Sequence, residues 1–279
     1  NVDDAQLYAL HLVKTPNTSL SFDVETNFEG FKIDDLEGSF SIDNIVFKKN
    51  EKEILINNVS LTAEKSENHI KTINLYSDYI NGTLKGQYLF TTLYFNLKQL
   101  ASQYLPTLIK REDELEKTEK RNNFTFNFEI DNTEPLNDIF KLPFVFTEQS
   151  QMSGFYNDNT NKIKVKIESP LITIGKTNMA DCTFLIENPR DCVKLLLRGT
   201  HLPNNRRRNP YFFSLSSNIK NDSLMADVHF SNAAEETYSG MISLTSIFKS
   251  FNEEGLTADI LINPSGIILN DTIWKMHKS

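Results

Sequence analysis

Short segments in which apolar and polar residues alternate, each followed by a turn-forming sequence, run through most of the chain. A period of two places every second side chain on the same face of a strand, so each segment predicts a β-strand with one apolar face. The turns between segments contain few residues, which favours antiparallel pairing of consecutive strands. We therefore expect a mainly β protein built as an antiparallel meander.

The segment Asn188-Pro189-Arg190-Asp191 has the composition of a turn between two apolar segments. Antiparallel pairing about this turn gives three apolar pairs on one face: Cys182 with Leu197, Phe184 with Leu195 and Ile186 with Val193. The same register separates Cys182 from Cys192 by about five residues, or roughly 16 Å, on opposite faces. Since a disulfide needs Cα atoms within about 7 Å, we expect both thiols to be free and Cys182 to be a small buried apolar residue.

Four further turns are predicted, three of them with their strand pairings. A turn at Asn221-Asp222 pairs Phe213 with Phe230, Leu215 with Val228, Ser217 with Ala226 and Ile219 with Leu224. A turn at residues 263–266 pairs Ile262 with Ile267 and Ile260 with Leu269. Across residues 49–52, Phe47 and Ile45 are expected to face Ile54 and Ile56. The dipeptide Asn81-Gly82 is typical of a two-residue hairpin turn.

Helical spacing replaces alternation in residues 92–110, where the apolar positions are Leu93, Leu97, Leu100, Tyr104, Leu105 and Leu108. Pro106 is expected to end or kink this helix near Leu105. The charged run at 110–123 predicts a solvated linker, and a second short helix is expected at 136–141. The resulting division is a β ladder at 1–91, a helix and charged loop at 92–122, and a longer β ladder at 123–279, which together can form one continuous elongated unit.

The composition excludes some functions and the motifs favour none that is catalytic. A formal net charge of −8 opposes binding to a nucleic-acid backbone, so we expect no nucleic-acid partner. The five histidines are scattered singly, and no nucleotide-binding or hydrolase motif is present. We therefore expect no enzyme and no catalytic, cofactor-binding or metal-binding residues, with paired carboxylates of the glycosidase type as the enzyme alternative.

One basic cluster, Arg206-Arg207-Arg208, lies between two prolines. Its position favours a solvated surface loop. Contact with anionic lipid head groups or with an acidic partner is the alternative.

The apolar face of the predicted strands has two structural explanations. In a β-sandwich it forms a core against a second sheet, and periodicity by itself favours this arrangement. In an open sheet the same face lines a groove. Both explanations remain open from the periodicity.

Residues 56–93 resemble the TamB family of AsmA-like proteins from Gram-negative envelopes. The similar motifs are Leu75-Tyr76-Ser77-Asp78, then residues 82–88 (GTLKGQY), then Phe90-Thr91-Thr92-Leu93 leading into a helix that ends in Tyr104-Leu105-Pro106. A second similar stretch is INPSGIILNDTIWKM at 262–276.

This resemblance implies an elongated antiparallel meander folded over into a groove, taco-like or an open β-roll, with one inserted helix. It implies an interior piece of a periplasmic protein that is anchored in the inner membrane and conducts phospholipids between the two membranes. It also implies support of outer-membrane protein assembly with an Omp85-type barrel, through parts of the parent protein outside this chain. The partners in the groove would be phospholipid acyl chains, and no cofactor is implied.

The groove would be lined by apolar positions of the predicted strands. They are Phe40, Ile42, Phe47, Ile54, Leu75, Leu84, Val165, Ile167, Phe184, Ile186, Val193, Leu195, Leu197, Leu215, Val228, Phe230, Ile260 and Ile262. The alternative function is a secreted or surface β-sandwich module that binds glycans or proteins through its loops. Such a module needs exposed aromatic platforms, for which Tyr156 and the sole tryptophan, Trp274, are the candidates.

Overall fold

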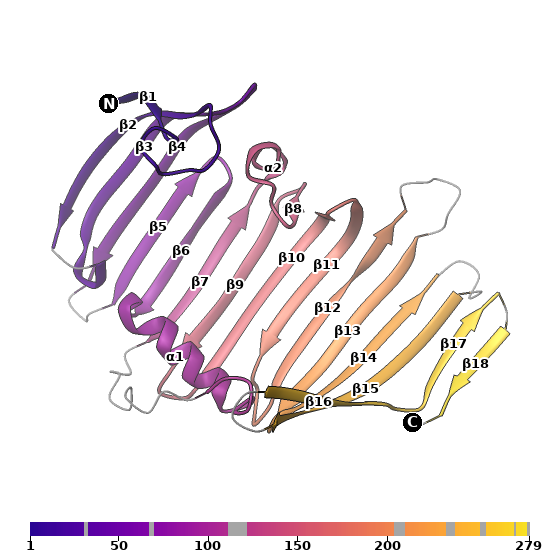
Figure 1. Ribbon diagram of the computed structural model, residues 1–279. Coiled ribbons are helices and arrows are strands. Elements are labelled where there is room, and N and C mark those ends of the chain that lie inside the picture. Colours follow the sequence, from indigo (N-terminus) through magenta and orange to yellow (C-terminus); the bar gives the residue numbers. More distant parts are fainter. Residues whose placement is uncertain are drawn as a thin grey trace.

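The computed structural model describes residues 1–30, 33–66, 70–110, 122–203, 210–232, 238–251, 255–270 and 272–277. In these residues eighteen strands form one antiparallel sheet, which is open and does not close into a barrel (Figure 1). The sequence-based prediction of a mainly β meander is therefore confirmed. The face that a sandwich would cover with a second sheet has no second sheet over it within the described ranges.

The elements follow in chain order. The first part contains β1 (Val2–Gln6), β2 (Thr18–Glu29), the 3-10 turn η1 (Ile33–Asp35), β3 (Glu37–Lys49), β4 (Lys52–Lys65), β5 (Lys71–Ser77), β6 (Ile80–Gln87) and helix α1 (Phe90–Ser102). The middle part contains β7 (Asn123–Ile130), α2 (Glu134–Phe140), β8 (Val145–Phe146), β9 (Ser150–Asn157), β10 (Lys162–Ile174), β11 (Thr177–Glu187) and β12 (Val193–Leu202). The last part contains β13 (Tyr211–Lys220), β14 (Ser223–Ser231), β15 (Tyr238–Phe251), β16 (Gly255–Ile262), β17 (Ser265–Leu269) and β18 (Thr272–Met276).

Neighbouring strands in the sheet are neighbours in the chain. The order runs from β1 to β7, continues with β9, and then runs from β10 to β15, so the N-terminal and C-terminal strands lie at opposite ends of the sheet (Figure 1). β8 and β9 both pair with β10, and β16 and β17 both pair with β15. Most of these strands follow one another through short connections, whereas the link from β6 to β7 contains α1.

The hairpin predicted at residues 263–266 is wrong. β16 and β17 do not pair with each other but continue along β15, where Leu244 faces Ile262 and Gly240 faces Ile267. Pro264 lies at the break between them, because proline has no N–H to give to a ladder. The hydroxyl of Ser265 accepts the free N–H of Ser243 there, at 3.0 Å.

The register predicted for the hairpin of β11 and β12 is shifted by two residues. Phe184 faces Leu197 and Ile186 faces Leu195, whereas Cys182 lies in a bulge opposite β12. The turn is longer than expected because Asn188 is buried and its amide donates to the hydroxyl of Tyr104, at 2.9 Å. A shift by an even number keeps the same side chains on the same face.

The other predicted pairings give two confirmations and one error. All four pairs of the β13 and β14 hairpin are confirmed, as are the pairs that join β3 to β4 at Phe47 and Ile54. Asn81-Gly82, however, lies inside β6 and not in a turn. The turn precedes it, where the hydroxyl of Ser77 accepts the N–H groups of Tyr79 and Ile80.

Gly82 is required for close packing inside the sheet. A Cβ atom at this position would lie 2.3 Å from Cδ1 of Phe128 and 2.3 Å from the carbonyl oxygen of Asn127. We expect Gly82→Ala to lower the free energy of unfolding by about 1–3 kcal/mol, because the ring and the strand must move. Thermal or urea unfolding measures the change. Gly266→Ala is the control, since its Cβ would meet no atom closer than 4.0 Å, and equal losses in both variants would contradict this explanation.

Both predicted helices are present. α1 ends at Ser102, three residues before the expected position, because the carbonyl of Tyr104 accepts the N–H of Asp222 from the β13 and β14 turn, at 2.9 Å. α2 ends in a left-handed residue, Lys141. Most of the charged run (111–121) and the three arginines of the basic cluster lie outside the described residues. No helix in the described part of the chain is both long enough and apolar enough to cross a membrane.

The two faces of the sheet differ in polarity. On one face, direct cross-strand partners from β3 to β15 form a continuous apolar row: Phe40, Leu61, Leu75, Gly82, Phe128, Met152, Ile167, Phe184, Leu197, Leu215, Val228 and Ile242. On the other face, the adjacent row from β4 to β15 is mainly polar: Thr62, Asn74, Thr83, Asn127, Ser153, Lys166, Leu185, Leu196, Ser216, Asp227 and Ser243. We call the first set the apolar row and the second the outer row.

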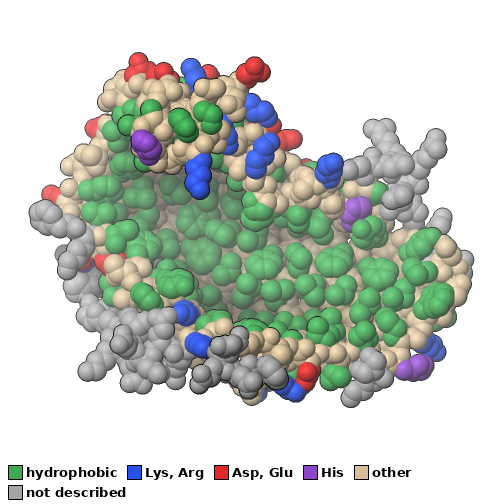
Figure 2. All heavy atoms as spheres, in the orientation of Figure 1, with side chains coloured by type: hydrophobic (Ala, Val, Ile, Leu, Met, Phe, Trp, Pro, Cys, Tyr) green, Lys and Arg blue, Asp and Glu red, His purple; other side chains and the backbone are tan. Residues whose placement is uncertain are grey.

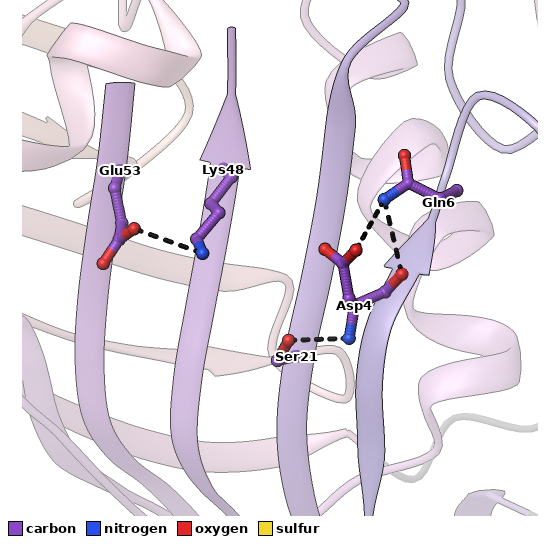
Figure 3. Close-up of polar contacts among 5 residues, drawn as sticks. All are labelled: Asp4, Gln6, Ser21, Lys48 and Glu53. Atoms are coloured by element: carbon purple, nitrogen blue, oxygen red, sulfur yellow. Dashed lines mark hydrogen bonds and ion pairs between the residues drawn. The ribbon is translucent and has the colours of Figure 1, made fainter. Parts of the chain in front are cut away.

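Polar contacts join the N-terminal strands. Figure 3 shows Lys48 of β3 beside Glu53 of β4, with Nζ and Oε2 3.5 Å apart, and the N–H of Asp4 donating to the hydroxyl of Ser21 at 2.8 Å. The Lys48 and Glu53 pair adjoins the Phe47 and Ile54 pair, so alternation puts it on the opposite face. The first strands therefore keep the same division into a polar and an apolar side.

Candidate apolar groove

The apolar face of the sheet is hollowed. Figure 2 shows hydrophobic side chains covering a broad concave surface over the middle strands. A second row runs beside the apolar row on this face: Gly38, Ala63, Ile73, Leu84, Phe126, Gly154, Val165, Ile186, Leu195, Ser217, Ala226, Leu244 and Ile262. We call the hollow lined by these two rows and their nearest neighbours the apolar groove.

Helix α1 forms one rim of the groove. Its residue Leu100, and Tyr104 just beyond its end, pack with Tyr88, Phe124 and Tyr156 in a buried cluster. Groove-face residues of the sheet pack against the same cluster: Ile73, Leu84, Phe126, Ile163, Val193 and Ile219. α1 therefore covers the edge of the apolar face and leaves its middle open.

Buried polar groups hold α1 against the sheet. Oδ2 of Asp158 accepts hydrogen bonds from the Asn96 amide at 3.1 Å, from the Asn122 N–H at 2.9 Å and from the Asn122 amide at 3.1 Å. Oδ1 of Asn122 in turn accepts the N–H of Leu89 at 2.9 Å. Beyond the other end of the helix, the carboxylate of Asp222 accepts from the N–H and the hydroxyl of Thr107, at 2.8 and 2.9 Å. The rim is thus fixed near both ends.

A pocket of about 560 Å³ lies in the N-terminal part of the groove. Its apolar lining includes Phe40, Leu61, Leu75 and Phe128 of the apolar row. The segment 33–36, which contains η1, lines it from one side, and Tyr88 and Phe90 at the start of α1 line it as well. The groove therefore forms a pocket where η1 meets α1.

The carboxylate of Asp34 joins these two sides. Oδ1 accepts the N–H of Phe90 at 2.6 Å, and Oδ2 accepts the hydroxyl of Thr91. A carboxylate at a helix N-terminus satisfies free N–H groups and complements the positive end of the helix dipole. The ammonium of Lys71 donates to the carbonyls of Asp34 and of Tyr88, and it lies 5.3 Å from the centre of the Tyr88 ring.

The structure places all eighteen predicted lining residues on the groove face, and sixteen of them lie away from α2. These sixteen are Phe40, Ile42, Leu75, Leu84, Val165, Ile167, Phe184, Ile186, Val193, Leu195, Leu197, Leu215, Val228, Phe230, Ile260 and Ile262. Leu84 and Val193 lie under α1. Ile260 and Ile262 are the most open, with Ile260 66% exposed.

The remaining two, Phe47 and Ile54, lie beside α2. The ring of Phe47 is 5.2 Å from that of Phe140, and the ammonium of the neighbouring Lys49 donates to the carbonyl of Ile139 at 3.1 Å. Ile54 is buried. Phe47 and Ile54 therefore pack near α2 and do not line the open part of the groove.

Several lining residues were missed by sequence reasoning. Phe124, Phe126 and Phe128 of β7 all point to the groove face, where Phe126 faces Gly154 and Phe128 faces Met152. Strict alternation in the β7 sequence, NFTFNFEI, was the signal that could have identified them.

Among the described residues, the ionisable groups near the groove do not form a metal site, because no cluster of three histidine, cysteine or acidic residues could hold a metal ion. Both cysteines are free and Cys182 is buried, as the hairpin pattern predicted. Burial and the charge of Asp181 raise the pKa of the Cys182 thiol. Burial also raises the pKa of Tyr88 to about 12, so this hydroxyl stays protonated at neutral pH.

Neither aromatic candidate for a glycan platform has the expected setting. Tyr156 lies in β9 and is only 3% exposed, under α1. Trp274 is exposed, but it lies on β18 where its cross-strand partner is Ile267. The prediction that Tyr156 is an exposed loop aromatic is therefore wrong.

No family model, no curated protein and no solved structure matches this chain.

Proposed function

We propose that this chain is a non-catalytic module that holds the acyl chains of phospholipids in its apolar groove. The observation that carries the proposal is the apolar row, in which each member is the direct cross-strand partner of the next from β3 to β15. A hydrocarbon chain lying along this row would meet no polar side chain.

The free energy available from such contact is large. Removing apolar surface from water is worth about 25 cal/mol per Å², or about 0.8 kcal/mol for each methylene. Repeated aliphatic and aromatic side chains offer similar contacts at each step along the row, so an acyl chain can be held without one preferred position. A lipid conduit needs this property, whereas a specific small-molecule site needs convergent polar groups.

The cellular setting follows from the resemblance to the TamB family and is part of the same proposal. In it the chain is a segment of a periplasm-spanning protein that is anchored in the inner membrane. Its groove conducts phospholipids between the inner and outer membranes, and other segments support outer-membrane protein assembly with an Omp85-type barrel. The polar outer row supports an aqueous surrounding for the other face of the sheet. A glycan-binding module has less support, because Tyr156 is buried.

Photocrosslinking tests the proposal on the purified chain. With p-benzoylphenylalanine placed at Ile260, which is exposed on the groove face, we expect irradiation to attach phospholipid that copurifies or is supplied in vesicles. Met225 is the matched control, because it is 53% exposed on the outer face of β14, which is separated from β16 by β15. Mass spectrometry of the intact protein measures the adduct. Equal labelling at both positions, or lipid-free protein that stays unlabelled at Ile260, would overturn the proposal.

A further inference from the structure

The pocket where η1 meets α1 differs from the rest of the apolar groove, because it has a side wall. In the chain, η1 lies between β2 and β3 and α1 lies between β6 and β7, so their contact spans the width of β3 to β6. Asp34 and Lys71 make the hydrogen bonds that hold this wall. The open part of the groove, toward β15, borders no such segment among the described residues.

From this geometry we infer that the pocket holds the methyl end of one phospholipid acyl chain while the head group stays in the open part of the groove. The inference rests on the proposed function and specifies where in the groove one acyl chain ends. A volume of about 560 Å³ falls within the range of ligand pockets, about 300–1,000 Å³.

The charges around the pocket favour a hydrocarbon end and not an anionic head. Four carboxylates, of Asp34, Asp35, Glu37 and Glu64, and two ammonium groups, of Lys65 and Lys71, belong to its lining. Lys65 lies 3.9 Å from Glu37, and Lys71 is bound to two carbonyls. The surplus of carboxylates repels a phosphate or a fatty-acid carboxylate. An acyl chain with a remote head group avoids this repulsion.

A peptide segment fits the pocket poorly. Each residue of a peptide brings one N–H and one C=O that need hydrogen-bond partners when they leave water. The floor of the pocket consists of side chains such as Phe40, Leu61, Leu75 and Phe128, which provide none. A hydrocarbon chain has no such requirement.

The pocket is also continuous with the open groove. Its floor residues Phe40, Leu61, Leu75 and Phe128 are members of the apolar row, which continues with Met152 and Ile167. A chain whose end lies in the pocket can therefore extend along the row toward β10. Its head group would then lie where the groove has no side wall.

Two diazirine-labelled phosphatidylcholines test the inference on the purified chain. One carries the diazirine on the terminal carbons of an acyl chain and the other carries it next to the glycerol. After irradiation and digestion, we expect the terminal probe to label peptides of β3 to β5 and the other probe to label peptides of the open groove. A terminal diazirine on palmitic acid is the third arm, and stronger labelling of the pocket by this free fatty acid would overturn the choice of occupant.

A matched pair of variants locates the label. Ala63 lines the pocket and Ala226 lies in the open groove, in the same cross-strand row and with similar exposure, 7% and 6%. We expect Ala63→Phe to lower terminal-probe labelling in β3 to β5 about tenfold, the effect of losing contact for about two methylenes. Ala226→Phe, on β14 and far from the pocket, should lower that labelling much less. Labelling in the pocket that survives Ala63→Phe would contradict the inference.

The outcomes separate this inference from the proposed function. Labelling of the open groove without terminal-probe labelling in the pocket overturns the inference alone. No labelling anywhere overturns both. If circular dichroism shows that Ala63→Phe does not fold, Asp34→Ala replaces it, with Glu53→Ala on the outer face of β4 as the control of equal charge change. Asp34→Ala should release η1 and reduce labelling of the pocket, whereas the control should not. Equal labelling in the two variants would contradict the inference that the pocket holds the end of the acyl chain.

Discussion

Replacing Leu197 by glutamate is expected to weaken phospholipid binding about a hundredfold, because a carboxylate loses its hydration when it lies against an acyl chain. Leu197 is in the middle of the apolar row, between Phe184 of β11 and Leu215 of β13. A chain lying along the groove cannot avoid this position without leaving the row. Native mass spectrometry of the amount of retained lipid, followed by titration with vesicles, measures the loss.

The neighbouring residue is the control for this substitution. Leu196 is the same residue type on the same strand, but it lies in the outer row between Leu185 and Ser216. Leu196→Glu adds the same charge to a similarly half-buried position on the opposite face, so lipid retention should stay near the wild-type level. If both variants lose lipid equally while thermal unfolding shows both to be folded, the bound lipid does not lie in the groove.

The contrast between Leu196 and Leu197 also marks what alternation can predict. The positions on one face of a strand follow from its period of two, and this was enough to place Phe184, Leu195 and Leu197 together even though their register was shifted. Alternation shows only which residues of a strand share a face. It does not say what lies opposite that face, which is why periodicity left a groove open as an explanation even though it favoured a sandwich core.

The errors came from long-range contacts. Asn188 lengthened a turn because it binds Tyr104, which is 84 residues away in the chain. Asn81-Gly82 has the pattern of a hairpin turn, yet Gly82 is needed to admit Phe128 from the adjoining strand β7. Rules that use only residues close together in the sequence cannot account for partners that are far apart in the chain and meet in the folded sheet.

The pocket at η1 could not be predicted for the same reason. Its wall depends on Asp34 reaching the N–H of Phe90, 56 residues later. Asp34 in the sequence is one of many acidic residues near a turn, and the start of α1 carries no capping side chain of its own. Only the folded structure shows that Asp34 caps the start of α1.

Removing the carboxylate of Asp158 is expected to lower the free energy of unfolding by about 3–5 kcal/mol. Asp158 is 1% exposed and Asn122 is 0% exposed, so water cannot replace the lost acceptor easily. Asp158→Ala would leave two donors of Asn122 and one of Asn96 without their acceptor. Unpaired buried donors are more costly than the net value of the hydrogen bonds that they made. Urea unfolding followed by circular dichroism measures this change.

Asp222→Ala is the appropriate comparison, because Asp222 also binds the α1 region but is only half-buried. Its loss should cost about 1 kcal/mol, since water can reach the donors of Thr107. A similar loss in both variants would show that burial of the Asp158 network is not what holds the rim.

The titration of Tyr156 distinguishes release of the α1 rim from a general loss of stability. Burial, and next the charge of Asp158, raise the pKa of Tyr156 above its ordinary value. In Asp158→Ala both causes weaken if α1 lifts from the sheet, so the pKa of Tyr156 should fall, as followed by ultraviolet absorbance. A released α1 would also uncover Leu84 and Val193 on the groove face and widen the groove. An unchanged tyrosine titration in a destabilised variant would mean that Asp158 stabilises the sheet without positioning the helix that borders the groove.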